Sequence, residues 1–361
     1  MSNSIIVTGG GTAGHVFPAL AVIERLKKKK DLEFLWIGSA NGVEREIVGK
    51  EDIPFLSIPC GKLRRYFDLR TIFMPFQVFA GIIVSIIHLL KYKPSLVFSK
   101  GGYVSVPPVI AAKILRIPAI THESDVDPGL ATKINSRFAD IICVSYKETK
   151  GRLPEKLRKK VKITGNPVRR AIFEGKPDKG RALFSVPRGM PVLLVVGGSS
   201  GALELNQYVY DNISQWSKYF FVIHQTGGAE KRSYRGENYS CKDFFSEEYP
   251  DILAAADLVL SRSGASAVWE CIVLQKPAVF VPLGRGSSRG DQYRNARTVA
   301  DTGAAVVVED DQRTSGFIGE LVKELMESDK DRKKMQEIYR SLLYNNASDE
   351  ISEILIQRIG E

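Results

Sequence analysis

The sequence predicts an α/β fold that consists of two similar, doubly wound (Rossmann-like) domains. First, a chain of 361 residues is too long for one ordinary hydrophobic core and suits two domains. Second, short apolar runs alternate with amphipathic stretches of helix length along the whole chain, which is the pattern of βαβ units. Third, a glycine-rich turn follows the first apolar run of each half.

The apolar runs predict two sets of buried parallel strands. The first set is expected at residues 4–9, 32–37, 95–99, 119–122 and 141–145. The second set is expected at residues 192–196, 220–224, 258–261, 278–281 and 304–308. A stretch rich in proline, glycine and charge lies between them. We therefore predict an N-terminal domain at residues 1–165, a linker at 166–188 and a C-terminal domain at 189–361 that ends in helices.

The two halves begin with the same kind of unit. Residues 5–14 and residues 193–201 each combine an apolar strand with a glycine-rich turn that leads into a helix. Chance recurrence of a common turn is the alternative explanation. We expect two similar domains that face each other across a cleft.

The composition is that of a globular protein with an excess of positive charge. The net charge of +10 and the pI of about 9.3 suit a partner that carries negative charge, such as a phosphate group or an anionic membrane surface. The sequence shows no zinc-finger or helix-turn-helix pattern, so we expect no nucleic-acid partner. The four cysteines lie far apart, as is typical of buried thiols in a reducing compartment. No signal peptide precedes the first strand, so we expect a cytoplasmic chain.

Both glycine-rich turns are suited to hold phosphate. Glycine after a buried strand lets the backbone approach a ligand, and the next helix directs its N–H groups and its positive dipole end toward an anion. Gly9, Gly11 and Gly14 even fit the spacing of a dinucleotide-binding turn. That turn requires an acidic residue at the end of the second strand, but the strand ends at Gly38 and Ser39. A dehydrogenase is therefore disfavoured.

Four polar side chains are candidates for a site near these turns. His15 follows the first turn, where it could cap the helix, bond a leaving diphosphate or take a proton from a hydroxyl. The Glu270 carboxylate suits either a ribose diol or the dipole of its own helix. Gln292 offers a donor and an acceptor to sugar hydroxyls, or faces solvent. Arg169 follows Pro167 in a stiff connector, and its guanidinium suits a diphosphate or solvent.

The longest apolar stretch covers residues 72–90 and almost reaches the length of a membrane-spanning helix. It lies inside the βαβ series, where a spanning helix would separate the strands. Basic and aromatic residues flank it on both sides, as in helices that dock onto anionic lipid. We predict a peripheral membrane patch, and a buried core helix is the alternative. The predicted patch consists of Ile72, Phe73, Phe76 and Phe79.

Seven short segments match, in order, the motifs of one known family. They are residues 10–20 (GGTAGHVFPAL), 99–105 (SKGGYVS), 122–125 (HESD), 165–169 (GNPVR), 197–202 (GGSSGA), 262–265 (RSGA) and 291–293 (DQY). One segment alone would be weak, but the ordered set covers almost the whole chain. The chain resembles the MurG family of bacterial transferases, which add GlcNAc from UDP-GlcNAc to the lipid-linked muramyl pentapeptide of peptidoglycan synthesis.

The resemblance implies a GT-B fold, in which the C-terminal half binds UDP-GlcNAc and the polyprenyl-pyrophosphoryl muramyl-peptide acceptor reaches the N-terminal half. It implies that Thr12, Ala13 and Gly14 line the donor sugar and diphosphate. Glu270 would hold the ribose, and His15 matches the family's histidine near the diphosphate. The other donor contacts that the resemblance implies are Arg169, Ser199, Phe245 (against uracil), Ala265 and Gln292.

Two positions depart from the family's pattern. Ala13 stands where many members have glycine, and its extra methyl group is small. Asp125 carries a charge where many members have an asparagine that contacts the sugar. Asp125 and Asp127 also resemble the paired carboxylates that hold a metal in another class of glycosyltransferases. Because helix N-termini and Arg169 can neutralise a diphosphate, we expect no metal and no cofactor.

The resemblance further implies an inverting reaction. The acceptor hydroxyl would attack the anomeric carbon of the donor, with His15 as the leading general base and Glu123 or Asp125 as alternatives. It implies a peripheral enzyme at the cytoplasmic face of the inner membrane, active in cell-wall synthesis, cell shape and division, with other cell-wall synthesis proteins as partners. One rival is another GT-B enzyme, such as a lipid glycosyltransferase or a UDP-GlcNAc epimerase. The other is a nucleotide-binding scaffold without catalysis.

Overall fold

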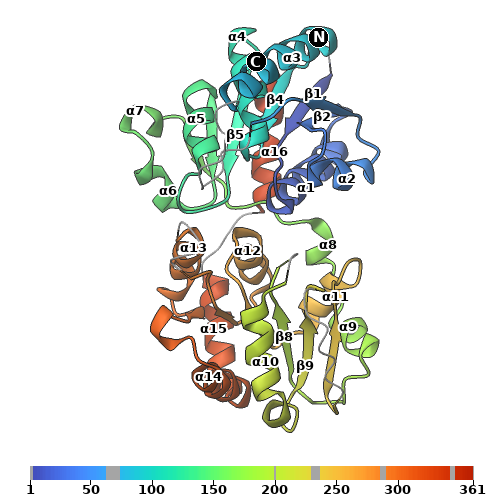
Figure 1. Ribbon diagram of the computed structural model, residues 1–361, viewed down its shortest axis with the longest axis vertical. Helices are drawn as coiled ribbons and strands as arrows, with labels where there is room; N and C mark the ends of the chain where they lie inside the picture. The colour runs from blue at the N-terminus through green and yellow to red at the C-terminus, as the bar shows by residue number, and fades with distance from the viewer. Residues whose placement is uncertain are drawn as a thin grey trace. The chain divides into compact units, whose positions relative to one another are not determined.

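A computed structural model describes residues 3–61, 74–198, 201–228, 236–284, 290–341 and 346–360 of the chain. The chain divides into two compact units (Figure 1). The N-terminal unit comprises residues 1–169 and 345–361, and the C-terminal unit comprises residues 170–344.

The described part of the N-terminal unit contains a sheet of seven parallel strands in the order β3-β2-β1-β4-β5-β6-β7. The strands are β1 (Ser4–Thr8), β2 (Glu33–Ser39), β3 (Phe55–Ile58), β4 (Leu96–Ser99), β5 (Ala119–Glu123), β6 (Ile141–Val144) and β7 (Val161–Ile163). The helices between them are α1 (Ala13–Lys29), α2 (Val43–Gly49), α3 (Met74–Tyr92), the 3-10 turn η2 (Tyr103–Ser105), α4 (Val106–Ile114), α5 (Leu130–Phe138), α6 (Lys147–Arg152) and α7 (Glu155–Arg158). Because β1 pairs with both β2 and β4, the loops after these strands meet at one edge of the sheet.

The N-terminal sheet is buried on both faces. Ile5 and Val7 of β1 enter one core with α1, and Ile6 enters a second core on the opposite face with α3 and α4. Two-sided burial explains why these strands are continuous apolar runs in the sequence and do not alternate with polar residues.

The last helix, α16 (Ala347–Gly360), belongs to the N-terminal unit, which corrects the prediction that all C-terminal helices belong to the C-terminal domain. Ile351 and Leu355 are fully buried in the core that contains α1. Asp349 also forms an ion pair with Arg25 of α1. Figure 1 shows α16, in red, among the blue and cyan elements of this unit. The apolar face of α16 is buried on α1, and a helix without a strand beside it carries no sequence signal for which sheet it covers.

The described part of the C-terminal unit contains a sheet of six parallel strands in the order β10-β9-β8-β11-β12-β13. The strands are β8 (Val192–Val196), β9 (Phe221–Gln225), β10 (Tyr239–Lys242), β11 (Leu258–Ser261), β12 (Ala278–Phe280) and β13 (Ala305–Val307). The helices are α8 (Arg170–Phe173), α9 (Pro177–Leu183), α10 (Leu203–Trp216), α11 (Tyr249–Ala255), α12 (Ala265–Leu274), α13 (Asp291–Ala300), the 3-10 turn η3 (Asp310–Gln312), α14 (Ser315–Glu327) and α15 (Asp329–Ser341).

The two sheets share one topology. The order β3-β2-β1-β4-β5-β6 corresponds to β10-β9-β8-β11-β12-β13, and the glycine-rich turns follow the equivalent strands β1 and β8. The repeated unit in the sequence therefore reflects a repeated fold. The prediction of two similar, doubly wound α/β domains is confirmed.

Most of the predicted linker at residues 166–188 folds into the C-terminal unit. α8 and α9 lie within it and pack against α11. A Cβ atom at Gly180 would collide with the carbonyl oxygen of Asp251, so the backbones of α9 and α11 touch. The Asp251 carboxylate accepts from the N–H of Lys176 at 2.8 Å and pairs with Lys179 at 2.6 Å. This stretch, although rich in proline, glycine and charge, therefore forms short helices that pack against α11.

Candidate functional site

The first glycine-rich turn brings His15 against the loop that follows β4. His15 lies in the first turn of α1, and its Nδ1 is 3.2 Å from the carbonyl oxygen of Lys100. A carbonyl oxygen only accepts, so the neutral ring that makes this bond carries its proton on Nδ1 and its lone pair on Nε2. A lone pair on a half-buried imidazole nitrogen is what a general base requires.

Glycines let the two loops touch through their backbones. Gly101 and Gly102 have φ angles of 88° and 78°, in the left-handed region that favours glycine. A Cβ atom at Gly102 would collide with the carbonyl oxygen of Gly10 and lie 3.1 Å from the ring of His15. The ring of His15 is therefore confined by backbone as well as by its hydrogen bond.

A buried carboxylate, Glu44 of α2, lies against the first glycine-rich turn. Its Oε2 accepts from the N–H of Gly11 at 3.0 Å. Its Oε1 accepts from the N–H of Ser39 at 3.0 Å and from the Ser39 hydroxyl. A Cβ atom at Gly10 or Gly42 would collide with this carboxylate. One amide of the turn that the sequence predicts to hold phosphate is thus occupied, and a carboxylate beside it repels an anion.

Lys100 links three loops at the carboxyl edge of the N-terminal sheet. Its side chain is buried, with 1% of the residue exposed, and its ammonium donates to the hydroxyl of Ser124 after β5. That hydroxyl donates in turn to Oδ1 of Asn166 after β7, at 3.0 Å. Burial lowers the pKa of Lys100 to about 8, although the nearby carboxylates of Glu123 and Asp125 oppose this shift.

The carboxylates around the end of β5 have different partners. Glu123 accepts from the N–H of Asp125 at 3.1 Å through one oxygen and from the N–H of Gly129 at 2.9 Å through the other, so it holds the turn. Asp125 is half-buried on that turn. Asp127 forms an ion pair with Arg152. Across the described ranges, no group of three or more His, Cys, Asp or Glu side chains is arranged to hold a metal.

Arg169 ends the N-terminal unit and lies against α1. Its guanidinium carbon is 4.5 Å from the centroid of the Phe17 ring, a cation–π contact. Phe17 lies two residues after His15, so this contact brings positive charge to the start of α1. Thr12 and Gly14 are exposed at the same end of the helix, and Ala13 is half-buried.

In the C-terminal unit, Gln225 holds the glycine-rich turn after β8. Its Nε2 donates to the carbonyl oxygen of Gly198 at 3.1 Å, and its Oε1 accepts from the N–H of Phe245 at 2.9 Å. Gly201 approaches the backbone after β9 so closely that a Cβ atom there would collide with it. Ser199, the predicted donor contact in this turn, lies outside the described residues.

The ring of Phe245 is buried, which differs from the predicted contact with uracil. Phe245 is 2% exposed and lies edge-on to Phe184, with ring centroids 5.9 Å apart. Its neighbour Phe244 is 47% exposed. A base stacks only on a ring that it can reach, so in this structure Phe244 offers that apolar surface and Phe245 does not.

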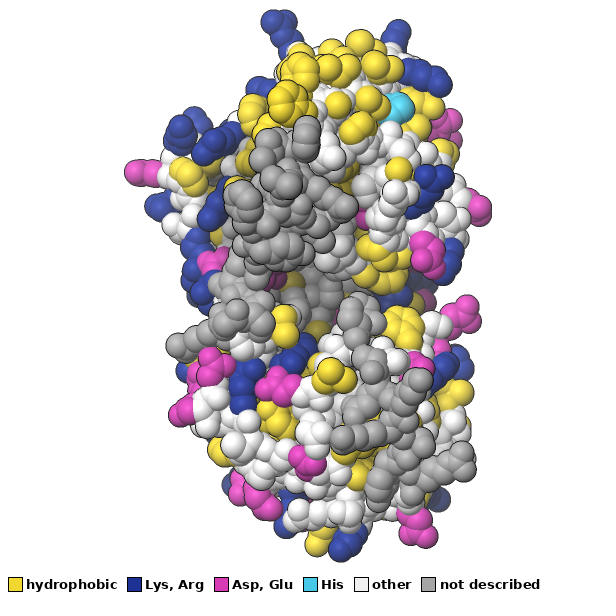
Figure 2. All heavy atoms as spheres, viewed as in Figure 1, with side chains coloured by type: hydrophobic (Ala, Val, Ile, Leu, Met, Phe, Trp, Pro, Cys, Tyr) yellow, Lys and Arg dark blue, Asp and Glu magenta, His cyan; other side chains and the backbone are white. Residues whose placement is uncertain are grey.

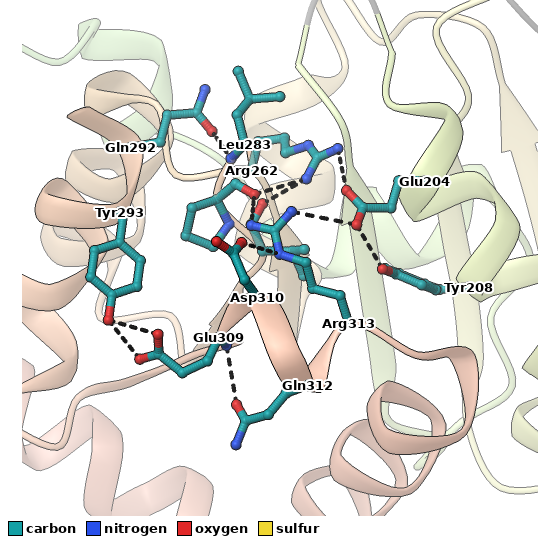
Figure 3. Close-up of polar contacts among 12 residues, drawn as sticks. Glu204, Tyr208, Arg262, Leu283, Gln292, Tyr293, Glu309, Asp310, Gln312 and Arg313 are labelled. Atoms are coloured by element: carbon teal, nitrogen blue, oxygen red, sulfur yellow. Dashed lines mark hydrogen bonds and ion pairs between the residues drawn. The ribbon is translucent and has the colours of Figure 1, made fainter. Parts of the chain in front are cut away.

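Two arginines share one carboxylate at the carboxyl edge of the C-terminal sheet (Figure 3). Arg262 lies 2.7 Å from Glu204 of α10, and Arg313 lies 3.5 Å from the same carboxylate. Both guanidinium groups also donate to the carbonyl oxygen of Pro282. Burial raises the pKa of Glu204, but hydrogen bonds from Tyr208 and Arg262 outweigh it, so the pKa lies below its usual value. This arginine cluster (Arg262, Arg313 and Glu204) fixes the turn between β11 and α12.

The remaining predicted donor contacts lie on α12 and α13. Ala265 begins α12, and Glu270, in its second turn, accepts from the hydroxyl of Tyr249 at 3.0 Å. Gln292 lies in the first turn of α13, and its Oε1 accepts from the N–H of Leu283 at 3.0 Å. Figure 3 shows Gln292 beside the arginine cluster. The structure therefore brings Gln292 to the segment after β12, which also carries the Pro282 carbonyl oxygen that accepts from Arg262 and Arg313.

α3 presents an apolar face that the protein does not cover, which rules out a wholly buried core helix. Phe76 and Phe79 are 70% and 64% exposed. The exposed large hydrophobic residues of α3 are Phe76, Phe79, Ile83, Ile87 and Leu90. Figure 2 shows hydrophobic side chains gathered over this helix, with lysine and arginine at the margin. Among the described residues, α3 is the one helix long and apolar enough to cross a membrane. Ile72 and Phe73 of the predicted patch lie outside the described residues.

Sequence reasoning gave no role to several polar residues that hold these loops. Lys100 and Gln225 carried a signal, since each is a polar residue at the end of an apolar run next to a glycine turn. Glu44, Glu204 and Arg313 carried none, because a charged residue in an amphipathic helix or a loop is ordinarily a solvated one.

Comparison with known proteins covers both units. The model of the glycosyltransferase family 28 N-terminal domain matches residues 5–144, and the model of the family 28 C-terminal domain matches residues 192–351. A crystal structure of Acinetobacter baumannii MurG has the same fold, with a TM-score of 0.77 and 24% identity over 98% of this chain and 99% of that one.

Curated relatives are similar over nearly their whole length. The UDP-N-acetylglucosamine–N-acetylmuramyl-(pentapeptide) pyrophosphoryl-undecaprenol N-acetylglucosamine transferase of Treponema denticola is 46% identical over 87% of this chain and 86% of that protein. The protein of the same name from Clostridium perfringens strain SM101 is 39% identical over 97% of both chains. The chain therefore belongs to glycosyltransferase family 28 and, within it, to the family of these N-acetylglucosamine transferases.

Proposed function

We propose that this chain transfers GlcNAc from UDP-GlcNAc to undecaprenyl-pyrophosphoryl-MurNAc-pentapeptide (lipid I), which gives lipid II in peptidoglycan synthesis. The observation that carries the proposal is the identity of 39% to 46% with transferases of that name over most of both chains. The site residues support it, because they lie on the loops and helices that follow the carboxyl ends of parallel strands, where doubly wound sheets bind ligands.

The N-terminal unit supplies the groups that act on the acceptor and the leaving diphosphate. The Nε2 lone pair of His15 takes the proton of the attacking hydroxyl as the bond to the anomeric carbon forms and the bond to UDP breaks. Attack on the face opposite UDP makes the reaction inverting. Arg169 and the N-terminus of α1 stabilise the charge that develops on the diphosphate. Asp125 contacts the sugar from the turn after β5.

The C-terminal unit binds the donor. Glu270 accepts from the ribose hydroxyls, Gln292 bonds the sugar, and the exposed ring of Phe244 covers the uracil. Ser199 and Ala265 complete the donor site on the turns after β8 and β11. The Gln225 side chain supports this role, because it already ties the glycine-rich turn to the loop that carries Phe244.

The exposed face of α3 docks the protein onto the cytoplasmic surface of the inner membrane, where its lipid acceptor lies. Rings of the size of Phe76 and Phe79 gain on the order of 1.5–3 kcal/mol each when they leave water, so two of them give useful binding. The net charge of +10 adds attraction to anionic lipid. The protein is thus peripheral, and other cell-wall synthesis proteins at that membrane are its partners.

Incubation of the purified chain with radiolabelled UDP-GlcNAc and a short-chain lipid I analogue tests the proposal. Label is expected in a disaccharide lipid with a β linkage. Release of a new UDP-sugar from the donor alone would identify an epimerase, and tight UDP binding without transfer to any polyprenyl acceptor would identify a scaffold. Either outcome would overturn the proposed function.

A further inference from the structure

Lys100 contacts two parts of the N-terminal site that lie far apart in the sequence, the first glycine-rich turn and the turn after β5. Its carbonyl oxygen accepts from Nδ1 of His15 at 3.2 Å. Its ammonium donates to the hydroxyl of Ser124, the residue next to Asp125. Its own N–H donates to the carbonyl oxygen of Thr8 at 2.8 Å, which fixes the residue at the end of β1.

The charge of Lys100 is balanced inside the protein. The titratable groups that face its ammonium are Glu123 and Asp125 at the end of β5, His122 in β5 and Cys143 in β6. Burial holds the pKa of His122 well below its usual range, and burial raises the pKa of Cys143 to about 12. Both groups are therefore neutral near pH 7. Of the groups that face the ammonium, the carboxylates of Glu123 and Asp125 carry the balancing charge.

A role in packing alone does not account for a lysine at this position. A buried ammonium loses its hydration, and an unbranched apolar side chain would fill the same space without that cost. Glu123 already accepts from the N–H groups of Asp125 and Gly129, and both bonds hold the turn. The carboxylate that a ligand can reach, and whose charge the ammonium balances, is therefore that of half-buried Asp125.

We propose that Lys100 is a positioning residue of the transfer site: its carbonyl sets the ring of His15, and its ammonium sets the place and the charge balance of the Asp125 turn. The inference rests on the proposed function. One residue makes both contacts, so a shift of its side chain is passed to its carbonyl and to His15. Lys100 itself touches neither substrate and acts through these two groups.

The test compares Lys100→Met with the wild type and with Lys113→Met, an exposed lysine on α4. Lys100→Met is expected to lower kcat roughly 10- to 100-fold with a smaller change in KM for UDP-GlcNAc, since a charge-assisted bond is lost and the donor contacts remain. Lys113→Met should leave both constants unchanged. Near-wild-type kcat in Lys100→Met would overturn the proposal.

The pH profile separates positioning from mere structural support. As pH rises through the Lys100 pKa of about 8, the ammonium loses its proton and Asp125 loses its counter-charge, so wild-type kcat should fall. Lys100→Met should lack this alkaline limb. A wild-type profile that is flat from pH 7 to pH 9 would overturn the proposal even if Lys100→Met fails to fold.

A charge-matched double variant provides the rescue. Asp125→Asn removes the carboxylate that Lys100→Met leaves unbalanced, so the double variant should have a higher kcat than Lys100→Met alone. A strictly additive loss would contradict the charge balance. If the wild type transfers no sugar to the lipid I analogue, the proposed function fails. If the wild type transfers sugar and Lys100→Met transfers it equally fast, only the inference about Lys100 fails.

Discussion

Glu44 should support the first glycine-rich turn, and replacement of its side chain tests this directly. The carboxylate accepts from the N–H groups of Gly11 and Ser39 and from the Ser39 hydroxyl. In Glu44→Ala, both N–H groups lose their acceptor in a half-buried place, whereas the hydroxyl can turn to another partner. The turn that carries His15 would thus lose its anchor.

The expected loss of unfolding free energy follows from the two N–H groups, of Gly11 and Ser39, that are left without an acceptor. A fully buried donor without a partner costs roughly 1–3 kcal/mol, so two half-buried donors cost roughly 2–4 kcal/mol, in the lower part of the range for two. Removal of a buried charge offsets part of this cost. We expect the free energy of unfolding of the N-terminal unit to fall by about 2 kcal/mol in Glu44→Ala. Glu44→Gln keeps one acceptor oxygen for both Ser39 groups and leaves only Gly11 unpartnered, so about half that loss is expected.

Pulse-labelling hydrogen exchange across a urea series measures the unfolding of each unit separately, which a single spectroscopic signal from a two-unit chain does not. The control is Glu46→Ala on the same helix. Glu46 is exposed and pairs with Lys50 at 3.4 Å, so its removal should change stability by less than about 0.5 kcal/mol. If Glu44→Ala unfolds at the same urea concentration as Glu46→Ala, the carboxylate does not support the turn.

Three further outcomes are expected. His15→Ala should lower turnover on the order of 10²- to 10⁴-fold with an unchanged circular dichroism spectrum, and near-wild-type turnover would remove this residue from the mechanism. Combined Phe76→Ser and Phe79→Ser should reduce sedimentation with anionic vesicles on the order of 100-fold, whereas Phe317→Ser, an exposed ring on α14, should not; equal losses would contradict docking through α3. Leu355→Ala should destabilise the N-terminal unit by about 2–5 kcal/mol, and a loss confined to the C-terminal unit would contradict the place of α16.

Ten strands could be predicted from the sequence because each is covered on both faces and therefore reads as an apolar run. Among the described strands, the three that sequence reasoning missed, β3, β7 and β10, are edge strands with one buried residue each, whereas the fourth edge strand, β13, has two and was predicted. These three strands are mostly not buried: in β7 only Val161 is buried, and Lys162 and Ile163 are not. Such a strand has no continuous run, and its three or four residues are too few to show alternation.

The site could be located from the sequence only in part. A glycine or a polar residue that follows an apolar run lies at the carboxyl edge of the sheet, and the structure has His15 in the helix after the β1 turn and Asp125 in the turn after β5. The partners of these residues could not be predicted, because they depend on contacts between distant segments. Lys100 meets Ser124 across 24 residues. The choice between two adjacent phenylalanines depended on Phe184, which only the fold brings into contact.

The place of α16 follows from the shape of α1. A helix that lies on a sheet needs one apolar stripe, and the opposite side is normally polar. In α1, six consecutive residues from 18 to 23 are buried, which is an arc wider than one sheet covers. This arc, visible in the sequence as Pro-Ala-Leu-Ala-Val-Ile, requires a second covering element, although it does not indicate which one. Ile351 and Leu355 meet that requirement from the other end of the chain. The core around β1, which carries the first glycine-rich turn, is therefore incomplete until the last helix has been synthesised and docked.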